Sequence, residues 1–499
     1  MSPWTTSRSN VPDAMSPAPA LSLADDFPSP TEAAWLRLVE KTLKGAALDS
    51  LVHATADGIE IQPFYGPELS AYPPLGPVAK VGQDGNWDIR ALCQAPNAAE
   101  ANRLLLADLN GGAASALVVI DNGQGDGVRL HDAASLAQVL DGVIIDLAPV
   151  ALDAGFLGPL ASDWLARAAK AAPQAPLAFH LDPLDAFART GVSRGPLAAH
   201  LASAAQAAAR HRATYPKASL FLASGRVVHE AGGSDAQELA FMTAAAVAYA
   251  KAGVEAGLTL QAALEGVVLG ASVDAEYFSG IAKLRAVRLL WDQLTNAFGV
   301  EAPAVIEARS SRRMLSKMDS ATNLIRLTVA NFAAAVGGAD AIVLDAFTQP
   351  FGAPGDLARR QARNIQLVLM EEAHLARVQD PGRGAWFIED YSRKLAQAAW
   401  RQFQDIESRG GLARALIDGS LAESIAAVRS HRRAAFETKA AELVGVNLHP
   451  NPADLPPPPV GSEPARTERA PDVGHEGADD HCPALSPIRW SEPFEGAVP

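Results

Sequence analysis

The sequence contains few groups of side chains whose types and spacing could carry out chemistry on their own. His229-Glu230 begins like the zinc-binding pattern H-E-x-x-H, but Gly233 stands where the second histidine is needed, so two imidazoles cannot converge on a metal ion. The run 122–127 is G-x-G-x-G rather than a full G-x-G-x-x-G turn, which indicates a flexible loop, with phosphate contact as the alternative. No G-x-S-x-G elbow, P-loop or paired-cysteine motif occurs, so hydrolase, NTPase and redox functions have no support from motifs.

Three aspartates follow expected strands, where the active sites of barrel enzymes lie: Asp121, Asp182 and Asp345. A cluster of carboxylates or a lysine at this position would suit a lyase or an aldolase. The more ordinary interpretation is that each aspartate caps the helix that follows it. A lyase-like barrel enzyme therefore stays open as one interpretation of the chain.

Composition excludes several classes of function. The chain has 499 residues, 48% of them hydrophobic, and a net charge of −14 that would repel nucleic-acid phosphates. The start of the sequence has no apolar leader region, and no run of about 18 apolar residues occurs, so we expect no membrane segment. With only Cys93 and Cys482, no disulfide framework or cysteine metal site is expected. These features predict a cytoplasmic protein that binds neither nucleic acid nor membrane.

Short apolar runs alternate with longer alanine-rich stretches, a pattern typical of βα units around a parallel sheet. Seven candidate strands and their intervening helices match a TIM (β/α)8 barrel in size, and a doubly wound sheet is the alternative. The expected strands are 116–121, 142–147, 177–182, 219–223, 264–273, 305–309 and 341–346.

Helical periodicity fills most of the remaining chain. In the segment 281–298, apolar residues recur at three- and four-residue spacing and leave Lys283 and Arg285 on another face. From Leu357 to Val444 no strand is expected, which predicts a helical appendage after the barrel. The segment 1–30 lacks periodicity, and the segment from Asn451 holds eleven prolines in 49 residues, so both ends are predicted to be disordered.

Four strings give the sequence its strongest signal, and all resemble the methylmalonyl-CoA mutase family. They are 41–45 (KTLKG), 55–65 (TADGIEIQPFY), 281–291 (IAKLRAVRLLW) and 364–389 (NIQLVLMEEAHLARVQDPGRGAWFIE). The resemblance implies a mutase-type TIM barrel preceded by an N-terminal arm that wraps a partner subunit. The expected regions are a disordered tail (1–30), the arm (31–75), the barrel (76–350), a helical segment (351–450) and a disordered proline-rich tail (451–499).

The resemblance also shows which catalytic residues of the family are missing. Active members carry the string RPWTIRQY, whose tyrosine lies beside the cofactor; here Trp87, Ile89 and Arg90 are kept, but Leu92 replaces that tyrosine. An isobutyl side chain offers neither the length nor the hydrogen bond of a phenol.

A second family string, SGYHMQEAG, supplies a tyrosine and a histidine that contact the substrate. Here it reads SGRVVHEAG, beginning at Ser224, so Arg226 replaces the tyrosine and Val227 replaces the histidine. Val227 cannot polarise a carbonyl group. His229 lies two positions further on and, on a strand-like segment, could face the same side, which leaves a substituting role open.

A third family string, like MVRNTYIFPP, contains the arginine that pairs with the substrate carboxylate, and nothing between Pro196 and Ser219 resembles it. In the string that begins at Ser310, Asp319, Asn323 and Arg326 are retained, whereas Arg312-Arg313 replace Gly-Trp. The framework is kept and the chemistry of the pocket is lost.

The cobalamin domain of the family is also not expected. Its D-x-H-x-x-G loop is imitated by the segment 479–484 (DDHCPA), which contains His481 but ends in Ala484 instead of glycine, with 15 residues to follow. Fifteen residues cannot form the flavodoxin-like domain that would present the histidine to cobalt. We therefore expect neither cobalamin nor another metal in this chain.

Together these substitutions lead to one main hypothesis. The chain is predicted to be the small, non-catalytic subunit of a heterodimeric mutase whose large catalytic subunit binds adenosylcobalamin and acyl-CoA. The alternative is an active mutase component that uses a cobalamin domain on a separate chain. No catalytic residue is expected, and a vestigial pocket is predicted from Trp87, Arg90, Ser224, His229, Asp319 and Asn323.

Overall fold

A computed structural model describes residues 31–66, 86–121, 127–451 and 471–496. The chain divides into two compact units, Met1–His53 and Ala54–Pro499. The tail predicted over 1–30 and most of the loop 122–127 lie outside the described residues.

The described part of the first unit contains helix α1 (Glu32–Leu43) and the 3-10 turn η1 (Leu48–Leu51). Helix α1 begins at Thr31, whose hydroxyl accepts a hydrogen bond from the Ala34 amide (3.2 Å), and ends at Lys44 in the left-handed conformation. None of its residues is buried, and Leu38 is 64% exposed. The short strands β1 (His53–Ala54) and β2 (Glu60–Ile61) follow.

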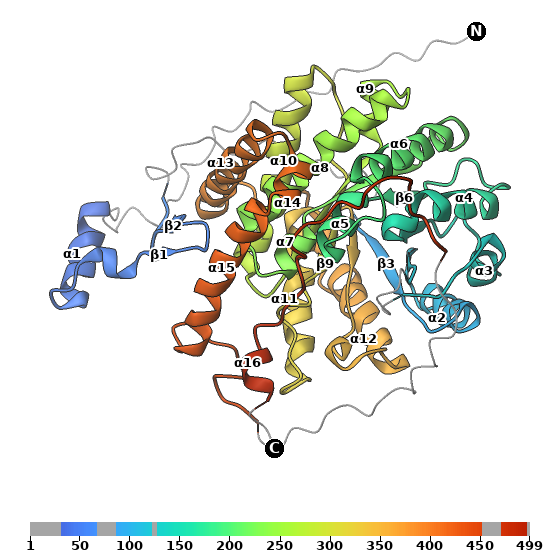
Figure 1. Ribbon diagram of the computed structural model, residues 1–499. Helices are drawn as coiled ribbons and strands as arrows, with labels where there is room; N and C mark the ends of the chain where they lie inside the picture. The colour runs from blue at the N-terminus through green and yellow to red at the C-terminus, as the bar shows by residue number, and fades with distance from the viewer. Residues whose placement is uncertain (1–30, 67–85, 122–126, 452–470, 497–499) are drawn as a thin grey trace, which may run out of the picture. The chain divides into compact units, whose positions relative to one another are not determined.

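The second unit is built on eight parallel strands that close into a barrel in the order β10-β3-β4-β5-β6-β7-β8-β9 (Figure 1). This arrangement confirms the predicted TIM barrel and excludes the doubly wound sheet. The strands are β3 (Asp88–Cys93), β4 (Ser115–Val119), β5 (Val150–Asp153), β6 (Ala178–Leu181), β7 (Ser219–Ser224), β8 (Val267–Val273), β9 (Ile306–Ser310) and β10 (Ala341–Val343).

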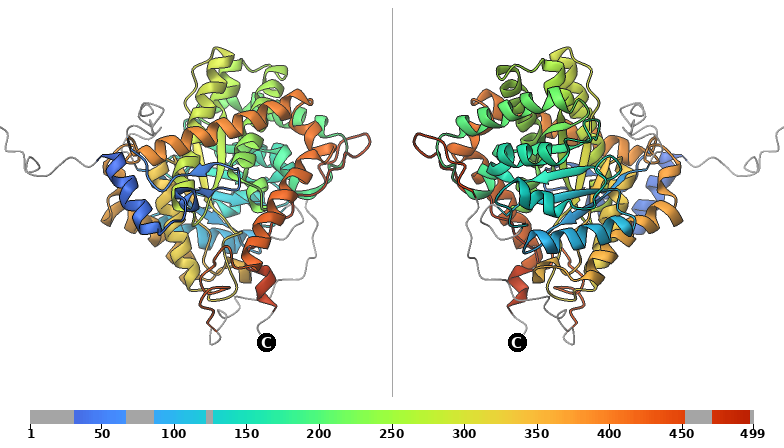
Figure 2. Two further views of the ribbon diagram at one scale, coloured as in Figure 1. Left: turned by 90° about the vertical axis from the view of Figure 1, so that its left-hand side faces the viewer. Right: turned by 90° about the vertical axis from the view of Figure 1, so that its right-hand side faces the viewer.

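Helices surround the strands on the outside of the barrel (Figure 2). Those of the barrel are α2 (Ala98–Asn110), α3 (Ala133–Val139), α4 (Gly158–Ala168), α5 (Pro183–Thr190), α6 (Leu197–Thr214), α7 (Arg226–Glu230), α8 (Asp235–Glu255), α9 (Leu260–Glu265), α10 (Tyr277–Phe298) and α11 (Thr322–Gly337), with the 3-10 turn η2 (Gly155–Leu157). No helix among the described residues is both long and apolar enough to cross a membrane.

The interior of the barrel is filled by side chains of alternate strand residues. Leu117 on β4 is paired in register with Leu92 on β3 and Ala151 on β5, and these residues belong to one apolar cluster with Val119 and Val343. Their neighbours along the strands instead pack against the helices, as the two-residue period of a strand requires. Leu92 therefore contributes to the packed interior of the barrel.

Six of the seven predicted strands are present, with ends shifted by a few residues, and one is wrong. The segment 142–147 forms turns, with Ile144 63% exposed and Leu147 76% exposed, and strand β5 begins only after Pro149. The apolar run 142–147 led to the wrong prediction. Strand β5 was missed because it has just four residues and contains Ala151 and Asp153, which favour strands weakly. Strand β3 was not predicted as a strand.

The helical appendage after the barrel is confirmed. It consists of η3 (Gln349–Phe351), α12 (Asp356–Leu367), the π-helical turn η4 (Val368–Glu372), η5 (Leu375–Arg377), α13 (Trp386–Ser408), α14 (Leu412–Ile417) and α15 (Ser420–Glu437). Helices α8 and α10 both pack against α13, so the two charged residues of α10 that were expected on another face are inside. Arg285 is 1% exposed and forms ion pairs with Asp380 and Glu389, while Lys283 is 2% exposed.

The prediction of a disordered tail over 451–499 is wrong for residues 471–496, which we call the C-terminal strap. Backbone amides of Cys482, Leu485, Ile488 and Trp490 donate to carbonyl groups of the barrel. Figure 1 shows the strap as a dark red trace that passes α5 and α7 and ends in α16 (Glu492–Glu495). Its prolines do not prevent this docking because the segment is extended, and the sequence composition concealed buried anchors such as Trp490, which is 6% exposed.

Candidate functional site

The carboxyl ends of the eight strands meet at one face of the barrel, where a cavity of about 330 Å³ opens. Active sites of TIM barrels are built at this face. Charged side chains of both signs line the cavity, and the strap contributes part of its wall. The residues that line the cavity include Asp153, Asp185, Arg189, Arg226, Val227, Glu230, Arg309, Arg312, Leu485, Ser486 and Pro487. We call this space the mouth cavity.

Two of the three replaced family positions lie at the mouth cavity. Arg226 and Val227 begin the short helix α7, directly after β7, and both side chains line the cavity. The Arg226 guanidinium makes no hydrogen bond or ion pair with any described residue, and its Nε is buried without a partner. The third position, Leu92, lines a larger cavity of about 670 Å³ next to β3 and α12. None of these three side chains can act as a general acid or base at neutral pH.

His229 does not face the mouth cavity, so the structure gives no support to a substituting role. The segment is helix α7 rather than the strand-like segment that we expected, and it carries the imidazole into the core, where it is fully buried. Its Nδ1 lies 3.1 Å from Glu238 Oε2, and its Nε2 lies 2.9 Å from Ser311 Oγ. Burial, reinforced by Arg313 and Lys283, lowers the pKa of His229 well below its usual value, so the ring is neutral.

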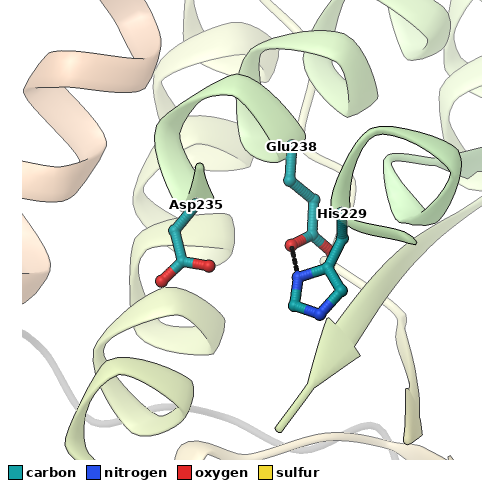
Figure 3. A group of neighbouring side chains, drawn as sticks. All are labelled: His229, Asp235 and Glu238. Carbon is teal, nitrogen blue, oxygen red and sulfur yellow. Dashed lines mark hydrogen bonds and ion pairs between the residues drawn. The ribbon is translucent and has the colours of Figure 1, made fainter. Parts of the chain in front are cut away.

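His229, Asp235 and Glu238 bring one ligand atom each within 4.8 Å of one another (Figure 3). This geometry resembles a metal site that the sequence did not predict. However, the Lys283 ammonium lies 2.8 Å from Asp235 and 2.7 Å from Glu238. Burial alone would raise the pKa of Asp235, but the ion pair with Lys283 outweighs burial and lowers it. The lysine therefore supplies the positive charge that a metal ion would bring.

The residues of the predicted vestigial pocket are not brought together. Trp87 donates from Nε1 to Gln366 (3.1 Å), and Arg90 forms ion pairs with Asp88 (2.8 Å) and Glu307 (2.5 Å). Arg90 lines the larger cavity, and none of the six predicted residues lines the mouth cavity.

The other three residues of that prediction also make local contacts. Ser224 accepts a hydrogen bond from the Arg226 amide (3.3 Å). Asn323 donates to the carbonyl oxygens of Ser316 (2.8 Å) and Phe347 (3.0 Å), and Asp319 has a positive φ of 47°. These contacts hold loops in place, so the structure points to framework roles for the retained residues.

Five charged lining residues were not predicted as site residues from the sequence: Asp153, Asp185, Arg189, Glu230 and Arg309. Asp153 ends β5, the strand that we misplaced, and Arg309 lies one residue before the end of β9. Reading the last residues of every strand, rather than family strings alone, would have found Arg309.

The predicted carboxylates have different roles. Asp182 caps α5 by accepting from the Asp185 amide (3.1 Å), as the ordinary interpretation requires. Asp345 instead accepts from Arg312 (2.9 Å) and Ser310 (2.9 Å), and Asp121 lies 3.9 Å from Arg129. The described residues that line the mouth cavity include no lysine, so a Schiff-base aldolase lacks its nucleophile.

The segment that imitates a cobalamin loop belongs to the strap and fastens it to the barrel. Asp479 accepts from the Gly195 amide (2.7 Å), and Asp480 accepts from the Leu197 amide (2.8 Å) at the start of α6. His481 is exposed and pairs with Val192 in an isolated bridge. Both carboxylates are thus used by backbone amides, and this segment serves to hold the strap on the barrel.

Asp57, in the family-like string 55–65, has a carboxyl group whose pKa is raised by its surroundings in the folded chain. It accepts from the Ala236 amide (3.2 Å) at the start of α8, and burial together with Asp235 raises its pKa to about 6 from 3.8. Because the folded state binds the proton more tightly, stability falls as pH rises from about 4 to 6, and the penalty is complete above that range. Asp57→Asn should therefore raise the free energy of unfolding at pH 7 by up to about 2–3 kcal/mol and flatten its pH dependence.

Urea denaturation at pH 4.5 and pH 7 measures this effect. Asp146→Asn, at an exposed position, is the matched control and should change neither value. A variant at Asp57 that loses stability at pH 7 would contradict the assignment.

Comparison with known proteins gives one consistent result. The family model described as methylmalonyl-CoA mutase matches residues 75–474. The chain is 34% identical to the methylmalonyl-CoA mutase small subunit of Streptomyces virginiae, covering 90% of this chain and 74% of that protein. It is 30% identical to the small subunit of Propionibacterium freudenreichii subsp. shermanii, covering 86% and 70%. The methylmalonyl-CoA mutase of Escherichia coli is 26% identical, covering 83% and 63%. By these matches and by its closed barrel, the chain belongs to the methylmalonyl-CoA mutase family.

Proposed function

We propose that this chain is the small, non-catalytic subunit of a heterodimeric methylmalonyl-CoA mutase, which converts methylmalonyl-CoA to succinyl-CoA. The observation that carries the proposal is the composition of the mouth cavity. Arg226 and Val227 occupy the positions of the family's tyrosine and histidine, and the strap residues Leu485, Ser486 and Pro487 line the same space. The cavity therefore lacks the donors that the family offers an acyl-CoA ester, and the strap forms part of its wall.

Adenosylcobalamin is assigned to the partner subunit in this proposal, together with the acyl-CoA substrate. In support, the described residues beyond position 470 form the strap rather than a doubly wound domain. His481 is exposed, and the neighbouring carboxylates Asp479 and Asp480 are held by backbone amides of the barrel. These residues therefore do not fit the cofactor.

The N-terminal arm, proposed to extend over 31–75, would bind the partner. Helix α1 has no buried residue, and the apolar Leu38 side chain is 64% exposed. An exposed leucine on an amphipathic helix is typical of a surface that packs against another chain. The free thiols of Cys93 and Cys482 suit the reducing cytoplasm, the proposed location of the complex.

Activity measurements test the proposal directly. The purified chain, supplied with adenosylcobalamin and methylmalonyl-CoA, should show no formation of succinyl-CoA. Co-expression with the large subunit from the same organism should yield a one-to-one complex that is active. Turnover by the isolated chain would disprove the non-catalytic role, and turnover after adding a separate cobalamin-binding protein would establish the alternative of a split enzyme.

A change on α1 tests the proposed role of the arm. Leu38→Glu places a charge in the expected interface, and glutamate preserves the helix, so the dissociation constant of the heterodimer should rise at least about tenfold. Surface plasmon resonance with the immobilised large subunit measures it. Glu40→Gln, on the same helix and already polar, is the control and should bind normally. Equal binding of the two variants would remove Leu38 from the interface.

A further inference from the structure

Arg309 is a buried cation whose hydrogen-bonding capacity is only partly used. It lines the mouth cavity from the end of β9 and is 4% exposed. Its nearest carboxylates are Asp153 at 3.5 Å and Asp345 at 3.8 Å, and its Nε has no hydrogen-bond partner among the described residues. Both ion pairs are longer than a good hydrogen bond, so the buried guanidinium is only partly satisfied, and such a group has capacity for a further acceptor.

Arg226 lines the same cavity as Arg309, and no hydrogen bond or ion pair joins its guanidinium to a described residue, although its charge acts on Glu230 and Asp153. Burial, followed by the positive charge of Arg226, lowers the pKa of Arg309 to about 10. Two like charges at short range repel each other unless an anion lies between them. The pair therefore offers two guanidinium groups to one ligand.

Three of the acidic residues around the cavity have other hydrogen-bond or ion-pair partners. Asp185 forms an ion pair with Arg189, and Asp345 accepts from Arg312 and Ser310. Glu230 accepts from the backbone amides of Arg312 and Arg313, both at 3.0 Å. Asp153 is the one lining carboxylate within 4 Å of Arg309, and at 3.5 Å it is beyond a good hydrogen bond. Arg226 and part of the Arg309 guanidinium thus remain available.

We propose that the mouth cavity is a binding site for a small oxyanion, a phosphate or a carboxylate, held between Arg226 and Arg309 beneath the C-terminal strap. Planar guanidinium groups bind such oxygens by paired hydrogen bonds. The strap residues Leu485, Ser486 and Pro487 reduce the access of water, which strengthens the ion pairs. A volume of about 330 Å³ admits a free phosphate or a small dicarboxylate. The site does not depend on the function proposed above.

Binding measurements on the full chain test this site. Isothermal titration calorimetry with inorganic phosphate and, separately, with malonate should give a saturable one-to-one isotherm for at least one of them. The anion that binds more tightly identifies the class of ligand. Arg226→Gln should weaken binding at least about tenfold, the loss expected when one charged partner of a buried ion pair is removed. Arg226 is partly exposed, so this variant should still fold.

Arg210→Gln is the matched control, because Arg210 forms an exposed ion pair with Asp163 far from the cavity lining. It should bind the anion as the unmodified chain does. Arg309→Gln gives a second measurement and should abolish binding, with circular dichroism used to verify its fold. The proposal is overturned if neither anion binds at about 10 mM. It is equally overturned if Arg226→Gln binds as tightly as Arg210→Gln.

Discussion

Trp490→Ala should destabilise the chain by about 3–5 kcal/mol, the usual cost of removing a buried tryptophan. The Trp490 indole stacks on Phe436 with ring centroids 5.4 Å apart. The guanidinium carbons of Arg313 and Arg432 lie 5.6 Å and 5.1 Å from its centre, so two cations share one aromatic ring. Its backbone amide also donates to the Arg313 carbonyl group at 3.0 Å. The residue thus anchors the strap to α15 and to the loop after β9.

Two measurements separate loss of the strap from loss of the fold. Urea denaturation reports the free energy of unfolding, and hydrogen exchange reports protection of the strap amides at Cys482, Leu485 and Ile488. We expect these amides to be protected in the unmodified chain and to exchange rapidly in Trp490→Ala. If the strap detaches before the barrel unfolds, the strap amides will lose more protection than the fall in the free energy of unfolding explains.

Trp386→Ala is the matched control, since Trp386 is 42% exposed at the start of α13. Trp386→Ala should lower the free energy of unfolding by much less than Trp490→Ala does. Strap amides that exchange like those of a free peptide in the unmodified chain would contradict the docked strap.

The strap illustrates where sequence reasoning failed. Its composition, with proline, glycine and charged residues, is typical of disorder. The anchors Leu485 and Trp490 are separated by four residues and show no helical or strand period that would indicate burial. Their partners, Ala188 and Arg313, lie 297 and 177 residues earlier in the chain, so only the folded barrel brings them together.

The barrel itself was predictable because its signals are local. Buried parallel strands such as Val267–Val273 are continuous apolar runs, and alternating helical segments imply βα units. Strand β5 escaped notice because it is four residues long, and β3 because it contains Arg90. Arg90 belongs in the interior only because Glu307, on the distant strand β9, lies 2.5 Å away.

The candidate site could be predicted only in part. The replacements Leu92, Arg226 and Val227 were visible from family strings, and the structure places Arg226 and Val227 at the barrel mouth. The grouping of Arg226 with Arg309 depends on the parallel strand order β7-β8-β9, which brings the carboxyl ends of β7 and β9 to the same face. No spacing in the sequence encodes that proximity.

The burial of Lys283 also could not be predicted from the sequence, because its position on α10 faces charged residues of another helix, α8. Lys283→Met should lower the free energy of unfolding at pH 7 by about 3–5 kcal/mol, since it leaves two buried carboxylates without their cation. Asp235 and Glu238 lie 2.8 Å and 2.7 Å from Nζ, and the Glu238 side chain is fully buried. Lys251→Met, which breaks an exposed pair with Glu407, should cost less than about 1 kcal/mol.

The pH and metal dependence of Lys283→Met distinguish loss of charge from loss of packing. Without the ammonium, the pKa values of Asp235 and Glu238 should rise, so the folded variant binds protons and its deficit should shrink as pH falls from 7 to 5. Zn²⁺ should also restore stability, because His229, Asp235 and Glu238 can then supply three ligands to one ion. A deficit that is insensitive to both pH and Zn²⁺ would mean that Lys283 stabilises the fold through the packing of its alkyl chain.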